Sequence, residues 1–171
     1  VISKDGIETD QTKIDAIRKF QNPSCVKHLR SFLGLTNYYR KFLKDYAKYS
    51  KVLEGLCGKN KDKKIIWTEE CNEAFQKLKE KMIKTPILAY PDFENEFILD
   101  TDASFDTIGA VLSQKDIYGR ERVIAYGSHK MNKHELGYCI TRKELLAIYY
   151  FTQHFKRQII IKNIFRAKNF Y

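Results

Sequence analysis

The fold is decided by the stretch EFILDTDASFDTIGAVLSQKDIYGRERVIAYGS (96–128) of this 171-residue chain. Within it, residues 96–102, 107–114 and 122–128 have the composition and alternation of β-strands that bury one face. The two connections, ASFD and DIYG, are short and consist mostly of turn-forming residues. The pattern therefore predicts a three-stranded antiparallel meander.

Helical periodicity marks the segments on either side of this meander. Before it, apolar residues recur at helical spacing over 10–21, 24–44, 46–56 and a further segment that follows Thr68. Ser24 and Thr68 are good N-caps for two of these helices. After the meander, the largely apolar run 141–154 predicts another helix. The order of helices followed by β-β-β-α predicts a mixed α and β fold (α+β or α/β), with two small domains that meet near residue 90.

Composition excludes several classes of protein. Hydrophobic residues make up 43% of the chain, which is enough to build a core and excludes wholesale disorder. No apolar run is long enough for a transmembrane helix, and the N-terminus has no signal-peptide pattern. The four cysteines are scattered without a CxxC pair, so we expect reduced thiols and an intracellular location, in the cytoplasm or nucleus. The first residue is not Met, which suggests a piece of a longer protein.

The net charge of +10 is unevenly distributed along the chain. Residues 1–90 carry 19 Lys and Arg against 11 Asp and Glu, whereas residues 91–151 carry 7 against 10. The last twenty residues, 152–171, carry 5 basic side chains and no acidic one. A basic first half beside an acidic block is typical of a nucleic-acid-binding protein with a cation site, although a lysine-rich solvated surface has the same composition.

Three carboxylates lie where the strand and helix patterns meet. Asp100 and Asp102 are two residues apart in one strand and share a face, where their charges repel unless a cation lies between them. Glu144 is in the first turn of the later helix, from which it can reach over the sheet. A strand-end aspartate opposite a helix glutamate is typical of Mg²⁺ sites for phosphodiester cleavage. The structural alternatives are that Asp102 caps the turn at Ser104 and that Glu144 completes a capping box with Thr141.

Several segments resemble one family in the same order along the chain. They are VISKDGIETDQTKIDAI (1–17), LRSFLGLTNYYRKF (29–42), IIWTEECNEAFQKLK (65–79), PILAYPDFENEFILDTDASFDTIGAVLSQ (86–114) and KELLAI (143–148). These segments are similar to gypsy-type retrotransposon Pol polyproteins, where the reverse transcriptase runs into its ribonuclease H domain. The resemblance implies four segments: the end of the palm (1–22), thumb-like helices (23–58), a connecting segment with one helix (59–93) and a truncated ribonuclease H-like domain (94–171).

The resemblance also implies roles for two of the carboxylates. The ribonuclease H domain of this family opens with three antiparallel strands and a helix. Its first catalytic aspartate precedes Ala-Ser and corresponds to Asp102, and its catalytic glutamate begins a Glu-Leu-Leu-Ala motif and corresponds to Glu144. These residues would hold Mg²⁺ or Mn²⁺, which activates water against the RNA strand of an RNA–DNA hybrid, with a second metal at the leaving oxygen. Asp100 matches no catalytic position and is expected in a supporting role or at the surface.

The chain departs from the family after Phe155. The family carries a third catalytic aspartate on a strand soon after the helix, and a fourth acidic residue later. Here the tetrapeptide RAKN (166–169) stands where the third is expected. If Lys168 occupies that position, its positive charge weakens metal binding, so weak or absent binding of Mg²⁺ is expected. The Tyr-x-Asp-Asp motif of the polymerase is also absent from the sequence, so both catalytic centres are incomplete.

A basic and aromatic set of residues is the candidate nucleic-acid-binding surface. Its members, all placed on one helix face, are Lys27, Arg30, Tyr38, Tyr39, Arg40, Lys41 and Lys44. By resemblance this helix lies in the thumb, which holds primer–template duplex, and phosphate contacts from it are physically reasonable. A solvated helix face is the alternative.

Two functions of different classes therefore follow. The chain is either part of a reverse transcriptase with ribonuclease H activity on RNA–DNA hybrids, acting with the rest of the Pol polyprotein, or a catalytically inactive nucleic-acid-binding module. Neither involves a membrane. The missing third carboxylate favours the second for the chain in isolation.

Overall fold

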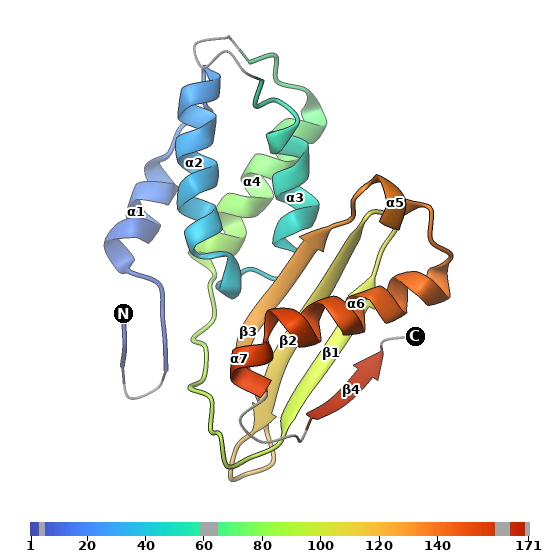
Figure 1. Ribbon diagram of the computed structural model, residues 1–171. Coiled ribbons are helices and arrows are strands. Elements are labelled where there is room, and N and C mark those ends of the chain that lie inside the picture. Colours follow the sequence, from blue (N-terminus) through green and yellow to red (C-terminus); the bar gives the residue numbers. More distant parts are fainter. Residues whose placement is uncertain (4–5, 59–64, 160–164, 170–171) are drawn as a thin grey trace.

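The structure, a computed structural model, describes residues 1–3, 6–58, 65–159 and 165–169. Helices α1 to α4 gather at one end of the molecule and a four-stranded sheet lies at the other, with α6 across one face (Figure 1). The helices are α1 (Gln11–Lys19), α2 (Val26–Tyr38), the 3₁₀ turn η1 (Arg40–Phe42), α3 (Tyr46–Glu54), α4 (Glu69–Ile83), α5 (Lys133–Leu136), α6 (Ile140–His154) and α7 (Lys156–Ile159). The strands are β1 (Phe97–Ala103), β2 (Thr107–Lys115), β3 (Glu121–Lys130) and β4 (Phe165–Asn169).

The helical part is held together by a core to which each of its helices contributes. Helix α4 starts as predicted, because the Thr68 hydroxyl accepts a hydrogen bond from the backbone N–H of Cys71. Its buried stripe is Cys71, Ala74, Phe75, Leu78 and Met82. Rings from neighbouring helices meet in this core, with Phe32 and Phe75 at a centroid distance of 4.5 Å.

The second helix differs from the prediction at both ends. Its N-cap is Cys25, which makes no side-chain capping bond, and the hydroxyl of Ser24 lies 3.4 Å from His28 Nδ1 instead. The prediction that the helix continues to about residue 44 is also wrong, because α2 ends at Tyr38 and the chain turns through η1. Contact with the sheet accounts for this turn: the Arg40 guanidinium donates to the backbone carbonyl of Ser128, at 2.7 Å.

The predicted antiparallel meander is confirmed, and a fourth strand extends it. The strand order is β3-β2-β1-β4, with β1–β2 and β2–β3 antiparallel. β4 pairs with β1 in parallel and was not predicted. Residues 160–164, which precede β4 in the sequence, lie outside the described residues, as do residues 59–64 at the start of the expected connecting segment.

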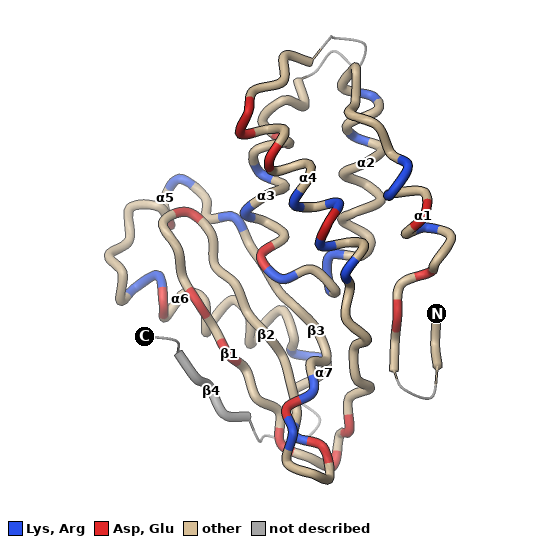
Figure 2. Tube along the Cα trace, turned by 180° about the vertical axis from the view of Figure 1, so that it is seen from behind, with Lys and Arg blue, Asp and Glu red and all other residues tan. Residues whose placement is uncertain are grey.

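The two faces of the sheet have different neighbours. Phe97, Leu99, Ala110, Leu112 and Ala125 form a core cluster with residues of α6, such as Phe151. At Gly127 the helix is so close that an added Cβ would lie 2.5 Å from Phe151 Cε1. On the opposite face, η1 and α3 lie against β3, while β1 and β2 are left uncovered by helices (Figure 2). This uncovered face carries Asp102.

The helical part is joined to the sheet by backbone-directed hydrogen bonds along β3. Ser128 Oγ accepts from the backbone N–H of Ala47 at 3.0 Å, and Ala89 N donates to Val123 O at 2.7 Å. Tyr126 and Val123 of β3 also pack against the helical core. The two parts therefore share one packed boundary. Within the described ranges, every helix is too short or too polar to cross a membrane.

Candidate active site

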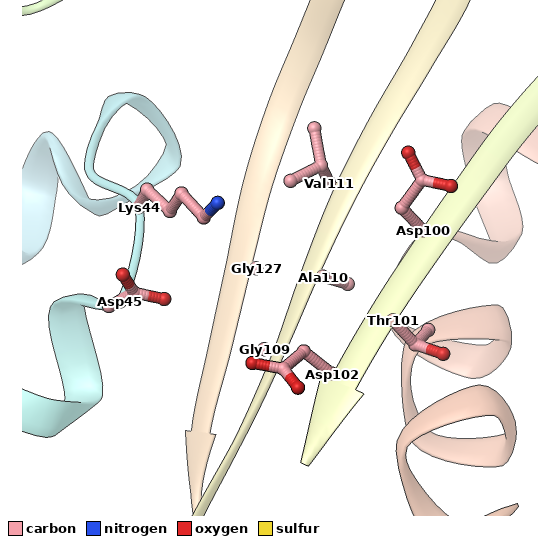
Figure 3. Close-up of a pocket in the computed structure, with 9 residues that line it drawn as sticks. All are labelled: Lys44, Asp45, Asp100, Thr101, Asp102, Gly109, Ala110, Val111 and Gly127. Atoms are coloured by element: carbon pink, nitrogen blue, oxygen red, sulfur yellow. The ribbon is translucent and has the colours of Figure 1, made fainter. Parts of the chain in front are cut away.

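Asp102 lies near the end of β1, on the face of the sheet opposite α6. Its strand partner on β2 is Gly109, which has no side chain to cover it. Asp102 is exposed, whereas Asp100, two residues earlier, is only 7% exposed, so the surface location considered for Asp100 is wrong. Both aspartates line a cavity of about 170 Å³ (Figure 3), together with Lys44, Asp45, Thr101, Gly109, Ala110, Val111 and Gly127.

Glu144 comes from the beginning of α6. The helix starts at Ile140 after the N-cap Cys139, so Glu144 is its fifth residue. The capping box with Thr141 is therefore wrong, because Thr141 is already inside the helix and caps nothing. Glu144 is free of a capping role, and its side chain reaches the end of β1, where the backbone N–H of Ala103 donates to its carboxylate.

The carboxylate of Glu144 is in an environment that does not favour its charge. Its Oε2 atom is buried and has no hydrogen-bond partner among the described residues. Burial raises the pKa of Glu144, and the nearby charge of Asp102 raises it further, while the bond from Ala103 lowers it. Asp102 and Glu144 are thus near enough for their charges to interact. A buried oxygen without a partner beside a second carboxylate suits a hard cation, which takes oxygen ligands.

Asp102 does not cap the β1–β2 turn, which was the alternative role considered for it. The β1–β2 turn is closed by Ser104, whose hydroxyl donates to the Thr107 carbonyl at 2.9 Å and accepts from the Thr107 N–H at 3.2 Å. Asp102 is therefore available for another role.

A third acidic ligand is not found among the described residues, which contain no group of three His, Cys, Asp or Glu side chains able to hold a metal. β4 runs beside β1 where the family's third aspartate is expected, but its register pairs Lys168 with Asp100 and Asn169 with Thr101. Lys168 is thus two residues short of Asp102, roughly 7 Å along the strand. The expected position of Lys168 beside Asp102 is not met by the backbone.

Sequence reasoning missed the residues that reach this face from the helical part. Asp45 and Lys48 line a second cavity with Asp102, next to the first. Asp45 adopts a left-handed conformation, with φ of 60°, and so turns the chain from η1 into α3 over the sheet. Aspartate tolerates this conformation better than most residues, but nothing local in the sequence marks it. Lys51 of α3 forms an ion pair with Asp106 after β1.

The seven predicted nucleic-acid-binding residues do not form one helix face. Because α2 ends at Tyr38, Lys41 lies in η1 and Lys44 beyond it. Tyr38 is 77% exposed, but Tyr39 is 8% exposed and belongs to the core. Lys27 and Arg30 lie near the start of α2, where Arg30 donates to the Gly58 carbonyl at 2.7 Å. Arg40 is occupied by Ser128 of β3. The set therefore divides into separate groups at the two ends of α2.

Comparison with known proteins identifies the family. Residues 67–165 match the family described as the RNase H-like domain found in reverse transcriptase. The chain is 42% identical over 160 residues to the "Retrovirus-related Pol polyprotein from transposon 297" of Drosophila melanogaster, covering 94% of this chain and 14% of that polyprotein. It is 41% identical to the corresponding polyprotein from transposon gypsy of the same organism, covering 86% of this chain and 15% of the relative.

Solved structures agree on the fold. The foamy viral protease-reverse transcriptase in complex with an RNA/DNA hybrid superposes with a TM-score of 0.81 and 22% identity, covering 98% of this chain and 22% of that one. The same enzyme in complex with double-stranded DNA gives a TM-score of 0.82, covering 98% of this chain and 34% of that one. The chain spans about one seventh of the transposon 297 polyprotein. It is similar to one short part of such retroelement polyproteins, and it belongs to the family of RNase H-like domains found in reverse transcriptases.

Proposed function

We propose that this chain is the part of a retroelement reverse transcriptase that holds an RNA–DNA hybrid or primer–template duplex and supplies two carboxylates of the ribonuclease H site. The observation that carries the proposal is the buried, unpartnered Oε2 atom of Glu144 beside Asp102. In the whole protein the activities would be RNA-directed DNA synthesis and cleavage of the RNA strand of hybrids. Its partners would be the nucleic acid and the rest of the Pol polyprotein, inside the cell.

Asp102 and Glu144 fit a divalent cation, which the family generally uses. Mg²⁺ and Mn²⁺ prefer carboxylate and water oxygens, and one such ion would relieve the repulsion that raises the pKa of Glu144. When bound, the ion would supply an activated water for attack on a phosphodiester. Asp102 and Glu144 themselves would fix the position of that ion at the end of β1, and Ala103 would orient the Glu144 carboxylate through its N–H.

A catalytically inactive nucleic-acid-binding module is the second candidate function, and it suits the chain by itself. The described residues contain no group of three His, Cys, Asp or Glu side chains that could hold a metal ion, and the sequence after Phe155 contains no Asp or Glu. Mg²⁺ keeps its waters and needs several carboxylates with substrate phosphate to stay in a site. We therefore expect millimolar or weaker metal affinity and hybrid cleavage at background level.

Duplex binding is expected to survive without catalysis. Lys27, Lys41, Lys44 and the exposed ring of Tyr38 would contact phosphates and sugars, in a manner that carries no sequence preference. The foamy viral structures are complexes with an RNA/DNA hybrid and with double-stranded DNA, which supports this choice of ligand. Binding through phosphates weakens steeply with added salt.

The test is an assay of purified 1–171 with a labelled RNA–DNA hybrid in Mg²⁺ and in Mn²⁺. We expect binding without cleavage, and no difference between the wild type and Asp102→Asn in the cleavage assay. Robust cleavage that Asp102→Asn abolishes would refute the inactive form of the proposal and establish the enzymatic one. Failure of the wild type to bind any duplex at low salt would refute both.

A further inference from the structure

A lysine-rich groove lies between α4, α3 and β3, and Lys44 is the one member of the predicted nucleic-acid-binding set that lines it. Its volume is about 400 Å³. Four lysines line it together with one glutamate, two tyrosines and three apolar residues: Lys44, Lys77, Lys81, Lys84, Glu80, Tyr49, Tyr126, Phe42, Leu43 and Pro86. The helical core and the Asp102 site do not account for this concentration of positive charge.

The lysines are arranged in a row by helical geometry. Lys77 and Lys81 lie one turn apart in α4, and Lys84 is the C-cap residue of this helix, so the spacing of four and three residues places all three on one side of it. They extend over about 10 Å of helix, which matches roughly three nucleotides of a strand at 3.4 Å each. One of them is partly neutralised, because Lys77 Nζ lies 3.6 Å from Glu80 Oε2, but that pair is more than half exposed and solvent screens it.

Aromatic rings flank this row. Lys81 Nζ lies 5.5 Å from the ring centroid of Tyr49, on which Lys48 also stacks at 6.0 Å. Tyr49 and Tyr126 are both half-buried, so each ring is fixed in the wall of the groove. Aromatic rings beside lysines are used by grooves that bind single strands, where bases stack on the rings, whereas against a duplex such rings can contact only the sugars and phosphates. A row of lysines that only kept the surface soluble would need neither the hollow nor the rings.

The groove and the cavity that contains Asp102 share one lining residue. Lys44 lines both the groove and the cavity that contains Asp102. Figure 2 looks onto the uncovered sheet face, and Lys and Arg segments of α3 and α4 lie on this same side as the acidic segments of β1. A strand seated in the groove would therefore pass Lys44 and reach the end of β1.

From this arrangement we infer that the groove binds the phosphodiester backbone of one strand of the duplex, just outside the Asp102 and Glu144 site. The inference rests on the proposed function for the identity of the duplex. It adds Lys77, Lys81 and Lys84 to the candidate binding residues and shares Lys44 with the set already proposed. The contact is with phosphates, so it carries no sequence preference and depends on salt.

The experiment compares two triple variants of the 1–171 protein by fluorescence anisotropy with a labelled hybrid of about 20 base pairs, in EDTA and at several salt concentrations. The groove variant is Lys77→Ala, Lys81→Ala and Lys84→Ala, and alanine is compatible with the helix at positions 77 and 81. The matched control removes three exposed lysines elsewhere, with Lys13→Ala, Lys19→Ala and Lys133→Ala. Both variants lose the same charge.

We expect the groove variant to bind about 10- to 100-fold more weakly near 0.1 M salt, and its salt slope to fall by about 2 to 3. The control should change affinity less than about 3-fold, and Lys→Arg at the three groove positions should restore binding. Equal losses in the two triple variants, with the wild type still bound, would overturn the groove and leave the proposed function standing. Displacement of the hybrid by an acidic peptide of equal charge and concentration would also overturn it. A loss of hybrid affinity in the groove variant alone would support the groove. If Asp102→Asn and Glu144→Gln also left metal binding unchanged, that result would count against the proposed metal site.

Discussion

The two faces of the sheet are made by the same strands but differ in what packs against them. On one face, alternate residues of β1, β2 and β3 meet α6 in a closed apolar core. On the other, the described helices of the helical part lie against β3, and the intervening residues of β1 are Ile98, Asp100 and Asp102. Because side chains alternate along a strand, residues of the apolar core and the candidate site residue Asp102 are neighbours in β1. Asp102 lies on the face that the helices leave uncovered, and Glu144 reaches the end of β1 from α6 on the covered face.

The largest expected effect comes from crowding the covered face. Gly127→Ala would place a Cβ 2.5 Å from Phe151 Cε1 and 3.1 Å from Phe155 Cζ, which buried rings cannot both avoid. We expect it to destabilise the protein by roughly 2–4 kcal/mol, measured by urea unfolding. The matched change on the uncovered face is Gly109→Ala, where the nearest atom to the new Cβ is Asp45 Oδ1 at 3.8 Å.

Gly109→Ala should change the free energy of unfolding by less than about 1 kcal/mol, because its Cβ makes only ordinary contacts. Equal unfolding midpoints for the two glycine variants would show that the faces do not differ in packing as described. That result would remove the physical basis of the comparison.

The next largest effect is expected where the start of α3 lies against β3. The N-cap of α3, Asp45, makes no side-chain capping bond, and the N–H of Ala47 in the first turn is instead satisfied by Ser128 Oγ of β3 at 3.0 Å. Ser128→Ala would leave that buried N–H without its partner. We expect a cost of about 1–2 kcal/mol in the free energy of unfolding.

Ser24→Ala is the control for this prediction. Ser24 is exposed and was predicted to cap α2, but it makes no capping bond. Its loss should be nearly neutral in the same urea titration. A cost for Ser24→Ala as large as that for Ser128→Ala would mean that the helix α2 is capped in solution as the sequence predicts, and that the α3 cap contributes little.

Local sequence signals were sufficient for one set of features and not for another. The meander, the Thr68 cap and the approximate span of α6 follow from patterns within a few residues, and all three are present. The end of α2 could not be predicted, because it depends on Arg40 contacting Ser128, 88 positions away. β4 depends in the same way on its partner β1.

The candidate site shows the same limit. Motifs pointed to Asp102 and Glu144, but the capping-box alternative for Glu144 could be rejected only from the true start of α6 at Ile140. The lysine row at positions 77, 81 and 84 was visible in the sequence as a helical spacing. Its significance was not visible, because Tyr49 and Tyr126 join it only through tertiary packing.

The smallest and most specific effect is expected at Glu144. Because burial and Asp102 raise the pKa of Glu144 in the folded protein, its stabilising contribution is present below the ordinary value of 4.5 and is lost as the pH rises through the folded value. At neutral pH the ionised carboxylate therefore destabilises the fold. Glu144→Gln removes the charge and keeps an oxygen that can accept from Ala103. We expect it to stabilise the protein at pH 7 by less than about 1 kcal/mol, because solvent screens a partly exposed group.

The pH profile and a metal titration together decide whether the destabilising charge of Glu144 belongs to a cation site. The stability difference between Glu144→Gln and the wild type, followed by thermal melting, should vanish as the pH falls toward 4 and grow toward neutrality. Millimolar Mn²⁺ should raise the melting temperature of the wild type, since an ion that binds only the folded state stabilises it, and should leave Glu144→Gln unchanged. A destabilised Glu144→Gln at pH 7, or an equal response of both proteins to Mn²⁺, would mean that the Glu144 carboxylate serves packing at the end of β1.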